Sequence, residues 1–246
     1  MEDKIGLPLL GHTPFVESSD LEHEGTNRFS ALMEAYASIR STIDYTLARE
    51  QNVIQLTSSQ ASEGKSTTGV ILAELFASLG RKTLLIDADL RRPSVARLLD
   101  IETPANGLVE VVLGHTDLQS TVVKGLHENL EILPIGSIAP NPTEILASPQ
   151  MREFIEKVRE EYSLVIFDSC PVMGLADAPL LSRVVDGTIF VLEANKVHFG
   201  QAKSAIKRVR GSGGNVFGVI LTKYRALQAG QSYDYQYAYY EYGQDK

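Results

Sequence analysis

Apolar residues recur every three or four positions between residues 26 and 50, which is the spacing of one face of an amphipathic α-helix. The apolar face consists of Phe29, Leu32, Met33, Tyr36, Ile39, Ile43 and Leu47. The spacing predicts a helix over 26–50, and the polar side chain of Thr26 or Asn27 is a suitable N-cap.

After residue 50 the pattern changes to short apolar runs separated by amphipathic or turn-rich stretches. The runs predicted to be strands are 53–57, 83–86, 130–133, 164–167, 188–192 and 216–221. The stretches predicted to be helical are 65–79, 94–99, 107–113, 148–161, a segment from 177 onward, and 200–210. Continuously apolar runs are typical of strands covered on both faces, and strand–helix alternation favours parallel pairing. The sequence therefore predicts an α/β fold, a mostly parallel sheet flanked by helices.

Composition excludes several classes of protein. Among 246 residues, 43% are hydrophobic, and 31 acidic side chains outnumber 23 basic ones for a net charge of −8. This balance disfavours nucleic acid as a partner, because non-specific binding to phosphate backbones needs clustered positive charge. Cys170 is the single cysteine, so no internal disulfide forms, and no apolar run has the roughly 18–20 residues of a membrane span. We expect a cytoplasmic domain.

A candidate phosphate-binding loop lies between the predicted strand 53–57 and the predicted helix 65–79. Such a loop places backbone N–H groups at a helix N-terminus, where the helix dipole favours anions. The residues predicted to bind the nucleotide are Ser62, Glu63, Gly64, Lys65, Ser66 and Thr67. Lys65 is expected to contact the β- and γ-phosphates and the Ser66 hydroxyl to ligate Mg²⁺. The usual pattern begins with glycine, where this chain has Ser59.

Three acidic residues follow buried strands. Asp87 and Asp89 come at the end of one predicted strand, and Asp168 follows another. The carboxyl ends of parallel strands lie at one edge of the sheet, where a carboxylate can hold Mg²⁺ directly or through water. Any one of them alone could be a solvated aspartate at a strand end. Together with the loop they predict a site for a nucleotide such as ATP with Mg²⁺, in which Ser66 and carboxylates of this set hold the metal.

Tyrosine is concentrated at the C-terminus. Of ten tyrosines, six lie in the last fourteen residues: Tyr233, Tyr235, Tyr237, Tyr239, Tyr240 and Tyr242. An aromatic edge strand and an RNA-stacking segment are alternatives, but the segment lacks aliphatic partners, and its acidic residues oppose RNA. Hydroxyl-bearing aromatics on a flexible tether beside a nucleotide site are suited to accept phosphate. We predict three parts of the chain: a leader at 1–25, a nucleotide-binding domain at 26–228 and a flexible tyrosine-rich tail at 229–246.

These motifs resemble those of the bacterial tyrosine kinases that accompany capsular and exopolysaccharide export. The resemblance covers nearly the whole chain. It consists of the loop ending in 63–67, the acidic motif 87–93 with its arginines, the motif at 168–171 and the terminal tyrosine cluster. It implies a P-loop NTPase fold of the partitioning-ATPase type and the activity of a non-specific protein-tyrosine kinase that uses ATP and Mg²⁺.

The resemblance also implies roles for individual residues. Lys65, Asp87, Asp89, Asp168 and Arg91 would be the catalytic residues. Of the first two acids, one would orient or deprotonate the incoming tyrosine and the other would support the metal, and we favour Asp87 as the base. Arg91 would neutralise developing charge. The six tail tyrosines would be phosphorylated in trans.

The resemblance further implies partners and a location. The expected partners are other copies of the chain, a membrane-embedded chain-length regulator that activates the kinase, and a protein-tyrosine phosphatase. The expected location is the inner face of the bacterial plasma membrane, and Leu7–Gly11 resembles the segment that follows a membrane helix in the family. The family's Glu-x-x-Arg-x-x-Arg motif for oligomerisation corresponds to Glu34, Ala37 and Arg40, and loss of its middle arginine weakens the predicted ring.

Two other functions remain open. A partitioning or division-site ATPase shares the fold and hydrolyses ATP without phosphorylating protein. Such ATPases usually carry a lysine at the second loop position, where this chain has Gln60. The other alternative is a nucleotide-binding scaffold without catalysis.

Overall fold

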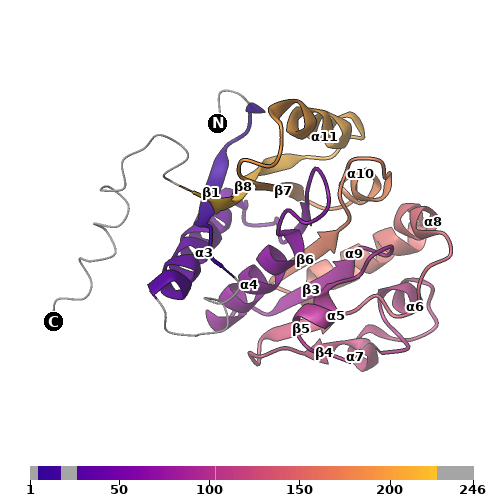
Figure 1. Cartoon of the computed structure of the whole chain (residues 1–246). Helices are drawn as coiled ribbons and strands as arrows, with labels where there is room; N and C mark the ends of the chain where they lie inside the picture. The colour runs from indigo at the N-terminus through magenta and orange to yellow at the C-terminus, as the bar shows by residue number, and fades with distance from the viewer. Residues whose placement is uncertain (1–4, 18–26, 103, 226–246) are drawn as a thin grey trace.

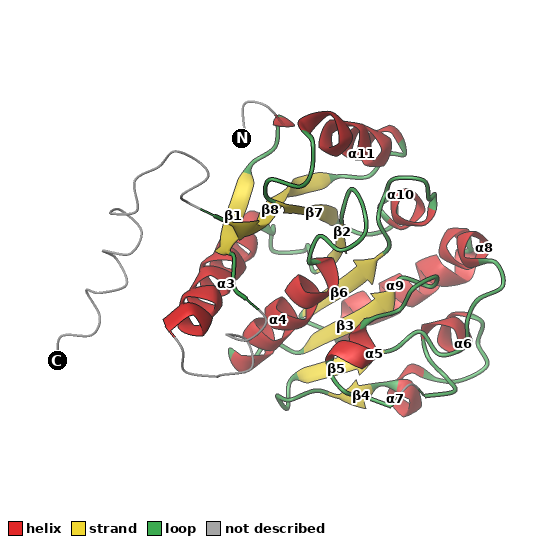
Figure 2. Ribbon diagram, in the orientation of Figure 1, coloured by secondary structure: helices red, strands yellow, loops and turns green. Residues whose placement is uncertain are grey.

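The part of the chain that the structure describes is built around an eight-stranded sheet with helices on both faces (Figure 1, Figure 2). The structure is a computed structural model and describes residues 5–17, 27–102 and 104–225. The strands are β1 (Leu9–Pro14), β2 (Val53–Thr57), β3 (Thr83–Ala88), β4 (Val123–Lys124), β5 (Leu130–Leu133), β6 (Leu164–Ser169), β7 (Gly187–Glu193) and β8 (Val216–Tyr224). Their order is β1-β8-β7-β2-β6-β3-β5-β4. All neighbours are parallel except β4 and β5, which confirms the predicted fold class.

Helices cover the two faces of the sheet in two groups (Figure 2). Their bounds are α3 (Asn27–Thr46), α4 (Lys65–Ser78), α5 (Val95–Leu98), α6 (Leu108–Val112), α7 (Leu118–Thr121), α8 (Pro142–Ala147), α9 (Pro149–Glu161), α10 (Asp177–Leu181) and α11 (Phe199–Gly211). Side chains of α3 and α4 share one apolar cluster with the sheet. Side chains of α6, α9 and α10 share a second cluster, and α11 packs on β7 and β8 in a third.

The central strands are buried on both faces, as their continuous apolar runs predict. In β3, Leu84 and Ile86 belong to the cluster with α9, whereas Leu85 belongs to the cluster with α3 and α4. In β6, Val165 and Ile166 divide between the clusters in the same way. Successive side chains of a strand point to opposite faces, so most positions of a strand with helices on both sides are apolar. Gln55 in β2 is a buried exception whose side chain donates hydrogen bonds to Ser169 and to the carbonyl of Ala178.

The predicted elements agree with the structure except at several ends. The helix expected over 26–50 is α3, and the strands expected at 53–57 and 130–133 are β2 and β5 with the same bounds. The strands β3 and β6 are each two residues longer than predicted, and the additions include Asp87 and Asp168. These two aspartates therefore lie inside the ends of their strands, where the sheet fixes their backbone, and not in the loops that follow.

The strand β1 was not predicted. It pairs in parallel with β8 at one edge of the sheet, so the sheet includes residues of the segment interpreted as a leader. Leu10 is buried in the cluster with α3. A Cβ atom at Gly11 would lie 2.5 Å from Ile39 Cγ1, so the absence of a side chain allows α3 to pack closely on this strand.

The strand order brings the predicted nucleotide site together. In the sheet, β6 lies between β2 and β3, and these are the strands that lead into the phosphate loop, Asp168 and the pair of acids at 87 and 89. Because neighbouring parallel strands end at one edge, the three motifs become adjacent in space, although Lys65 and Asp168 are 103 residues apart in sequence.

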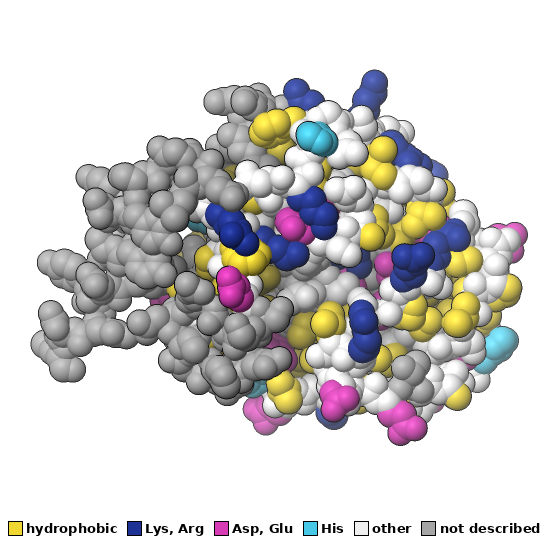
Figure 3. Space-filling model, viewed as in Figure 1, with side chains coloured by type: hydrophobic (Ala, Val, Ile, Leu, Met, Phe, Trp, Pro, Cys, Tyr) yellow, Lys and Arg dark blue, Asp and Glu magenta, His cyan; other side chains and the backbone are white. Residues whose placement is uncertain are grey.

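The surface carries a mixture of charges. On the face seen in Figure 3, lysine and arginine side chains lie among acidic, hydrophobic and other side chains. Among the described residues, no helix is both long enough and apolar enough to cross a membrane.

Candidate nucleotide-binding site

The loop between β2 and α4 has the backbone shape of an anion-binding turn. Ser62 has φ 65° and Gly64 has φ 88°, and Gly64 is the N-cap of α4. Left-handed residues curl the chain so that successive N–H groups point into one concavity, at the positive end of the helix dipole. The loop therefore has the geometry to bind phosphate.

Glu63 holds the loop closed. One oxygen of its carboxylate accepts the backbone N–H of Ser59 at 2.8 Å, and the other accepts the Ser59 hydroxyl at 2.8 Å. Burial raises the pKa of Glu63, and the bonds from Ser59 partly oppose that rise. The serine that replaces the usual first glycine thus adds a hydrogen bond across the loop. The Glu63 side chain therefore stabilises the shape of the loop, while its backbone forms part of the concavity at the start of α4.

Two residues from other parts of the sheet also hold the loop, although the sequence did not predict them. The Thr222 hydroxyl, in β8, donates to the carbonyl of Glu63 at 2.8 Å. Lys196, after β7, donates to the carbonyl of Ser62 at 3.3 Å. No local motif marks either residue, because both act across the sheet on backbone atoms.

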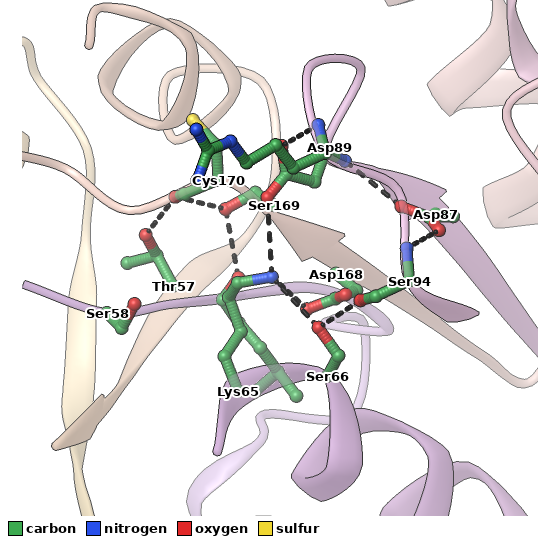
Figure 4. Close-up of polar contacts among 12 residues, drawn as sticks. Thr57, Ser58, Lys65, Ser66, Asp87, Asp89, Ser94, Asp168, Ser169 and Cys170 are labelled. Atoms are coloured by element: carbon green, nitrogen blue, oxygen red, sulfur yellow. Dashed lines mark hydrogen bonds and ion pairs between the residues drawn. The ribbon is translucent and has the colours of Figure 1, made fainter. Parts of the chain in front are cut away.

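Two of the three predicted acids, Asp89 and Asp168, contact Lys65, and Asp87 lies beside them on β3 (Figure 4). Asp87 and Asp168 lie opposite each other on the neighbouring strands β3 and β6. Lys65 Nζ lies 2.8 Å from Asp168 Oδ1 and 3.8 Å from Asp89 Oδ2. Burial raises the pKa of Asp168, and the charge of Lys65 opposes that rise. The single ammonium group partly compensates a cluster of three carboxylates, so the site retains negative charge that suits a cation.

One oxygen of this cluster is buried without a partner. Among the described residues, Asp168 Oδ2 is the buried side-chain oxygen or nitrogen that lacks any hydrogen-bond partner. A buried carboxylate oxygen is stable only when something binds it. Together with the Ser66 hydroxyl close by, it offers the hard oxygen ligands that Mg²⁺ prefers.

The protein supplies only part of a metal site. In the described part of the chain, no group of three or more His, Cys, Asp or Glu side chains could hold a metal ion. Mg²⁺ is commonly bound by one or two carboxylates together with phosphate oxygens and water. The residues present therefore fit a cation that enters with a nucleotide better than one held by the protein alone.

Asp87 differs from the other two acids because backbone groups surround it. Its Oδ2 accepts the N–H groups of Ser94 and Val95, each at 2.9 Å, and its Oδ1 accepts the N–H of Asp89 at 3.2 Å. Burial, followed by the charge of Asp168, raises the pKa of Asp87 to about 6. A carboxylate with a raised pKa is a better proton acceptor than an ordinary aspartate.

Arg91 has its partners outside this cluster. Its guanidinium donates to Asp177 from Nε at 2.6 Å and from Nη2 at 3.1 Å, and it also contacts the hydroxyl of Thr143. The structure thus brings Lys65, Ser66 and the three acids together, and fixes Arg91 to α10 at the rim. Asp177 was noted in the sequence only as the start of a helix, since its partner is 86 residues away.

The remaining predicted residues divide into two groups. Thr67 lies exposed in the first turn of α4. The six tail tyrosines lie outside the described residues, so the structure does not test their role as phosphate acceptors.

Comparisons with known proteins agree with this geometry. A family model described as an AAA domain matches residues 51–199. The tyrosine-protein kinase YwqD of Bacillus subtilis (strain 168) is 36% identical over 189 residues, which are 76% of this chain and 79% of that protein. The putative tyrosine-protein kinase CapB of Staphylococcus aureus is 29% identical over 217 residues, covering 88% of this chain and 92% of its own.

Solved structures show the same fold. The kinase domain of the Escherichia coli tyrosine kinase ETK superposes with a TM-score of 0.82 at 25% identity, covering 96% of this chain and 97% of that one. The septum site-determining protein MinD of Pyrococcus horikoshii OT3, solved with Mg-ADP, has a TM-score of 0.60 at 23% identity, covering 71% of each chain. The second likeness concerns the fold alone.

A phosphate loop at the start of a helix, with acids at the ends of adjacent parallel strands, defines a P-loop NTPase. Within that class, the identity to YwqD over most of both chains is decisive. This chain belongs to the family of bacterial tyrosine-protein kinases.

Proposed function

We propose that this protein is an ATP- and Mg²⁺-dependent protein-tyrosine kinase that phosphorylates its own C-terminal tyrosines in trans and regulates capsule or exopolysaccharide polymerisation and export. The observation that carries the proposal is the buried cluster in which Lys65 contacts Asp168 while Asp168 Oδ2 lacks a partner. The names of the relatives YwqD and CapB support tyrosine as the acceptor.

The protein acts mainly by positioning and by charge. Phosphoryl transfer needs its phosphates held in line with the acceptor and its developing negative charge neutralised. The loop amides and Lys65 would hold the phosphates, and Ser66, Asp89 and Asp168 would hold Mg²⁺. When bound, Mg²⁺ would neutralise charge on the phosphate oxygens.

Asp87 is the proposed base. A free tyrosine has a pKa near 10, so a carboxylate must help its proton leave during transfer. The pKa of Asp87, raised by burial to about 6, favours this role over that of an ordinary solvated aspartate. Arg91 would neutralise charge only after leaving Asp177. While it remains bound to Asp177, it fixes the position of the segment that carries Asp89.

The acceptor is proposed to be the tail of a neighbouring copy. Each phosphotyrosine adds about −1.5 to −2 charge, so phosphorylation of all six would add on the order of −9 to −12. That is comparable with the net charge of −8 of the whole chain, and repulsion would then separate the copies. The other proposed partners are a membrane-embedded activator segment, in the same or another chain, and a tyrosine phosphatase. The proposed location is the inner face of the plasma membrane.

Mixing two variants tests transfer between copies. Lys65→Met provides the tail without a working site, and a chain ending at residue 228 provides the site without the tail. With MgATP and the cytoplasmic segment of the membrane activator, we expect phosphotyrosine on the Lys65→Met chain only when both are mixed. Phosphate release from ATP by the wild-type chain without tyrosine labelling would instead favour the ATPase. Nucleotide binding with neither activity would favour the scaffold.

A further inference from the structure

Ser94 connects two groups of the site. Its hydroxyl donates to Ser66 Oγ at 2.8 Å, and its backbone N–H donates to Asp87 at 2.9 Å (Figure 4). We propose that Ser94 is a positioning residue that orients the Ser66 hydroxyl toward the cation accompanying the nucleotide. The inference deepens the proposed function and rests on it only in requiring that nucleotide binds together with a divalent cation.

The Ser94 side chain does not cap the helix that begins after it. Ser94 is the N-cap of α5, where a serine oxygen ordinarily accepts a backbone N–H of the first turn. It makes no such bond. Asp87 instead accepts the N–H groups of Ser94 and Val95. Because Asp87 has taken over the capping, the hydroxyl of Ser94 is available to reach across to Ser66.

The Ser66 hydroxyl has a limited number of hydrogen-bonding positions. A hydroxyl has one proton to donate and two positions to accept. Both acceptor positions are in use: Lys65 Nζ donates to Ser66 Oγ at 3.1 Å and Ser94 at 2.8 Å. The proton of Ser66 must therefore point away from both of these donors.

This arrangement determines what happens when Lys65 moves to the phosphates. Its departure would open one acceptor position on Ser66, while Ser94 continues to fill the other. With Ser94 still bound, the lone pair that opens on Ser66 faces the position that Lys65 has left. Without Ser94, the hydroxyl could rotate and point a lone pair elsewhere, at an entropic cost to metal binding.

The segment that carries Ser94 is held in place on both sides of this residue. Asp89 Oδ1 accepts the N–H of Arg92 at 3.1 Å. The next residue is Pro93, whose ring fixes its backbone φ angle. On the other side, the side chain of Val95 is fully buried. A hydroxyl on a fixed segment loses little freedom when it orients a neighbour, as a supporting residue must.

The experiment compares nucleotide affinity with and without the cation. The dissociation constant of a fluorescent ADP analogue is measured in Mg²⁺ and in EDTA for the wild type, Ser94→Ala, Ser94→Thr and the control Ser204→Ala. Ser204 is an exposed serine of α11 whose hydroxyl bonds only its own helix. The thermal midpoint of each protein without nucleotide reports on folding.

We expect Ser94→Ala to weaken binding in Mg²⁺ by about three- to tenfold, the value of one lost hydrogen bond, and to leave binding in EDTA unchanged. Ser94→Thr, which keeps the hydroxyl, should recover most of the loss, and Ser204→Ala should match the wild type. Equal weakening in Mg²⁺ and EDTA, or no weakening at all, would overturn the inference. If Mg²⁺ strengthens nucleotide binding to the wild type but the protein phosphorylates no tyrosine, the proposed kinase activity is refuted. The role of Ser94 in cation-dependent binding is not.

Discussion

At the scale of single residues, Lys65 is the positive charge that the site needs in order to fold. It contacts Asp168 at 2.8 Å, and both side chains are almost fully buried. Removing one partner of a buried ion pair leaves an uncompensated charge and costs about 3 kcal/mol or more. We therefore expect Lys65→Met to lose stability as well as activity.

The expected result for Lys65→Met is tyrosine phosphorylation reduced by at least about 100-fold and a free energy of unfolding lower by about 3 kcal/mol. Anti-phosphotyrosine detection and urea denaturation measure the two effects. Lys203→Met, at an exposed position of α11, is the matched control and should change neither. Undiminished phosphorylation in Lys65→Met would contradict the assignment of the site.

The stability that Glu110 contributes to the fold should depend on pH. Its carboxylate accepts the N–H of Gly107 at 2.9 Å and that of Ser137 at 3.3 Å, and so holds the loop after β5 to α6. Burial acts to raise the pKa of Glu110, but the hydrogen bonds outweigh it, and the pKa lies below its ordinary value of 4.5. A lowered carboxyl pKa stabilises the fold above the ordinary value, and that stability is lost as pH falls through the lowered one.

Glu110→Gln should therefore lower the free energy of unfolding by about 1–2 kcal/mol near neutral pH, with a smaller difference well below pH 4.5. Urea denaturation of both proteins at neutral and acidic pH measures the difference. A difference that stays constant with pH would show that the charge of Glu110 does not stabilise the loop.

At the scale of elements, α4 has a glycine in a left-handed conformation at each end. Gly64 precedes it with φ 88° and Gly80 follows it with φ 82°. Alanine in either conformation is strained by about 1–2 kcal/mol. Gly64 differs from Gly80 in that it lies in the phosphate loop, where a Cβ atom would lie 3.4 Å from Thr222 Cγ2, whereas a Cβ atom at Gly80 would have nothing within 4 Å.

We expect Gly64→Ala and Gly80→Ala to lower stability by similar amounts, about 1–2 kcal/mol. Only Gly64→Ala should also weaken nucleotide binding, by at least about tenfold, because its loop amides must approach the phosphates. Thermal unfolding and titration with a fluorescent nucleotide separate the two effects. Equal nucleotide affinity in both variants would contradict the phosphate loop.

The elements themselves were predictable where a local signal exists. Short, mainly apolar segments identify β2 and β5 to the residue. Ser148 followed by proline marks the start of α9, where its hydroxyl accepts the N–H of Met151. No such signal marks β1, whose sequence includes Gly11 and Pro14. This strand forms because α3 covers Leu10 and β8 offers an edge, and β8 lies at the other end of the described chain.

At the scale of the whole molecule, α3 presents the positions of the oligomerisation motif away from the core. Leu32, Tyr36 and Ile39 are buried against the sheet, whereas Glu34 is exposed and Ala37 is half-buried. An arginine at position 37 has room to extend, and a charge-assisted contact across an interface contributes about 1.5–3 kcal/mol.

Ala37→Arg should therefore strengthen self-association by at least about tenfold, measured by analytical ultracentrifugation over a range of protein concentrations. Ser38→Arg adds the same side chain at the next, exposed position of α3 and is the matched control. If both variants associate equally, added charge alone is responsible and the motif has no role.

The sequence by itself determined the fold class and the residue types of the candidate site. Apolar runs, a loop that ends in Lys65 and Ser66, and acids at strand ends are local patterns, and each follows from a residue and its near neighbours. The tertiary structure decided the contacts between segments: Arg91 with Asp177, Thr222 with the loop, and Ser94 with Ser66. These depend on strand order, which brings distant residues side by side and leaves no periodic signal in the chain.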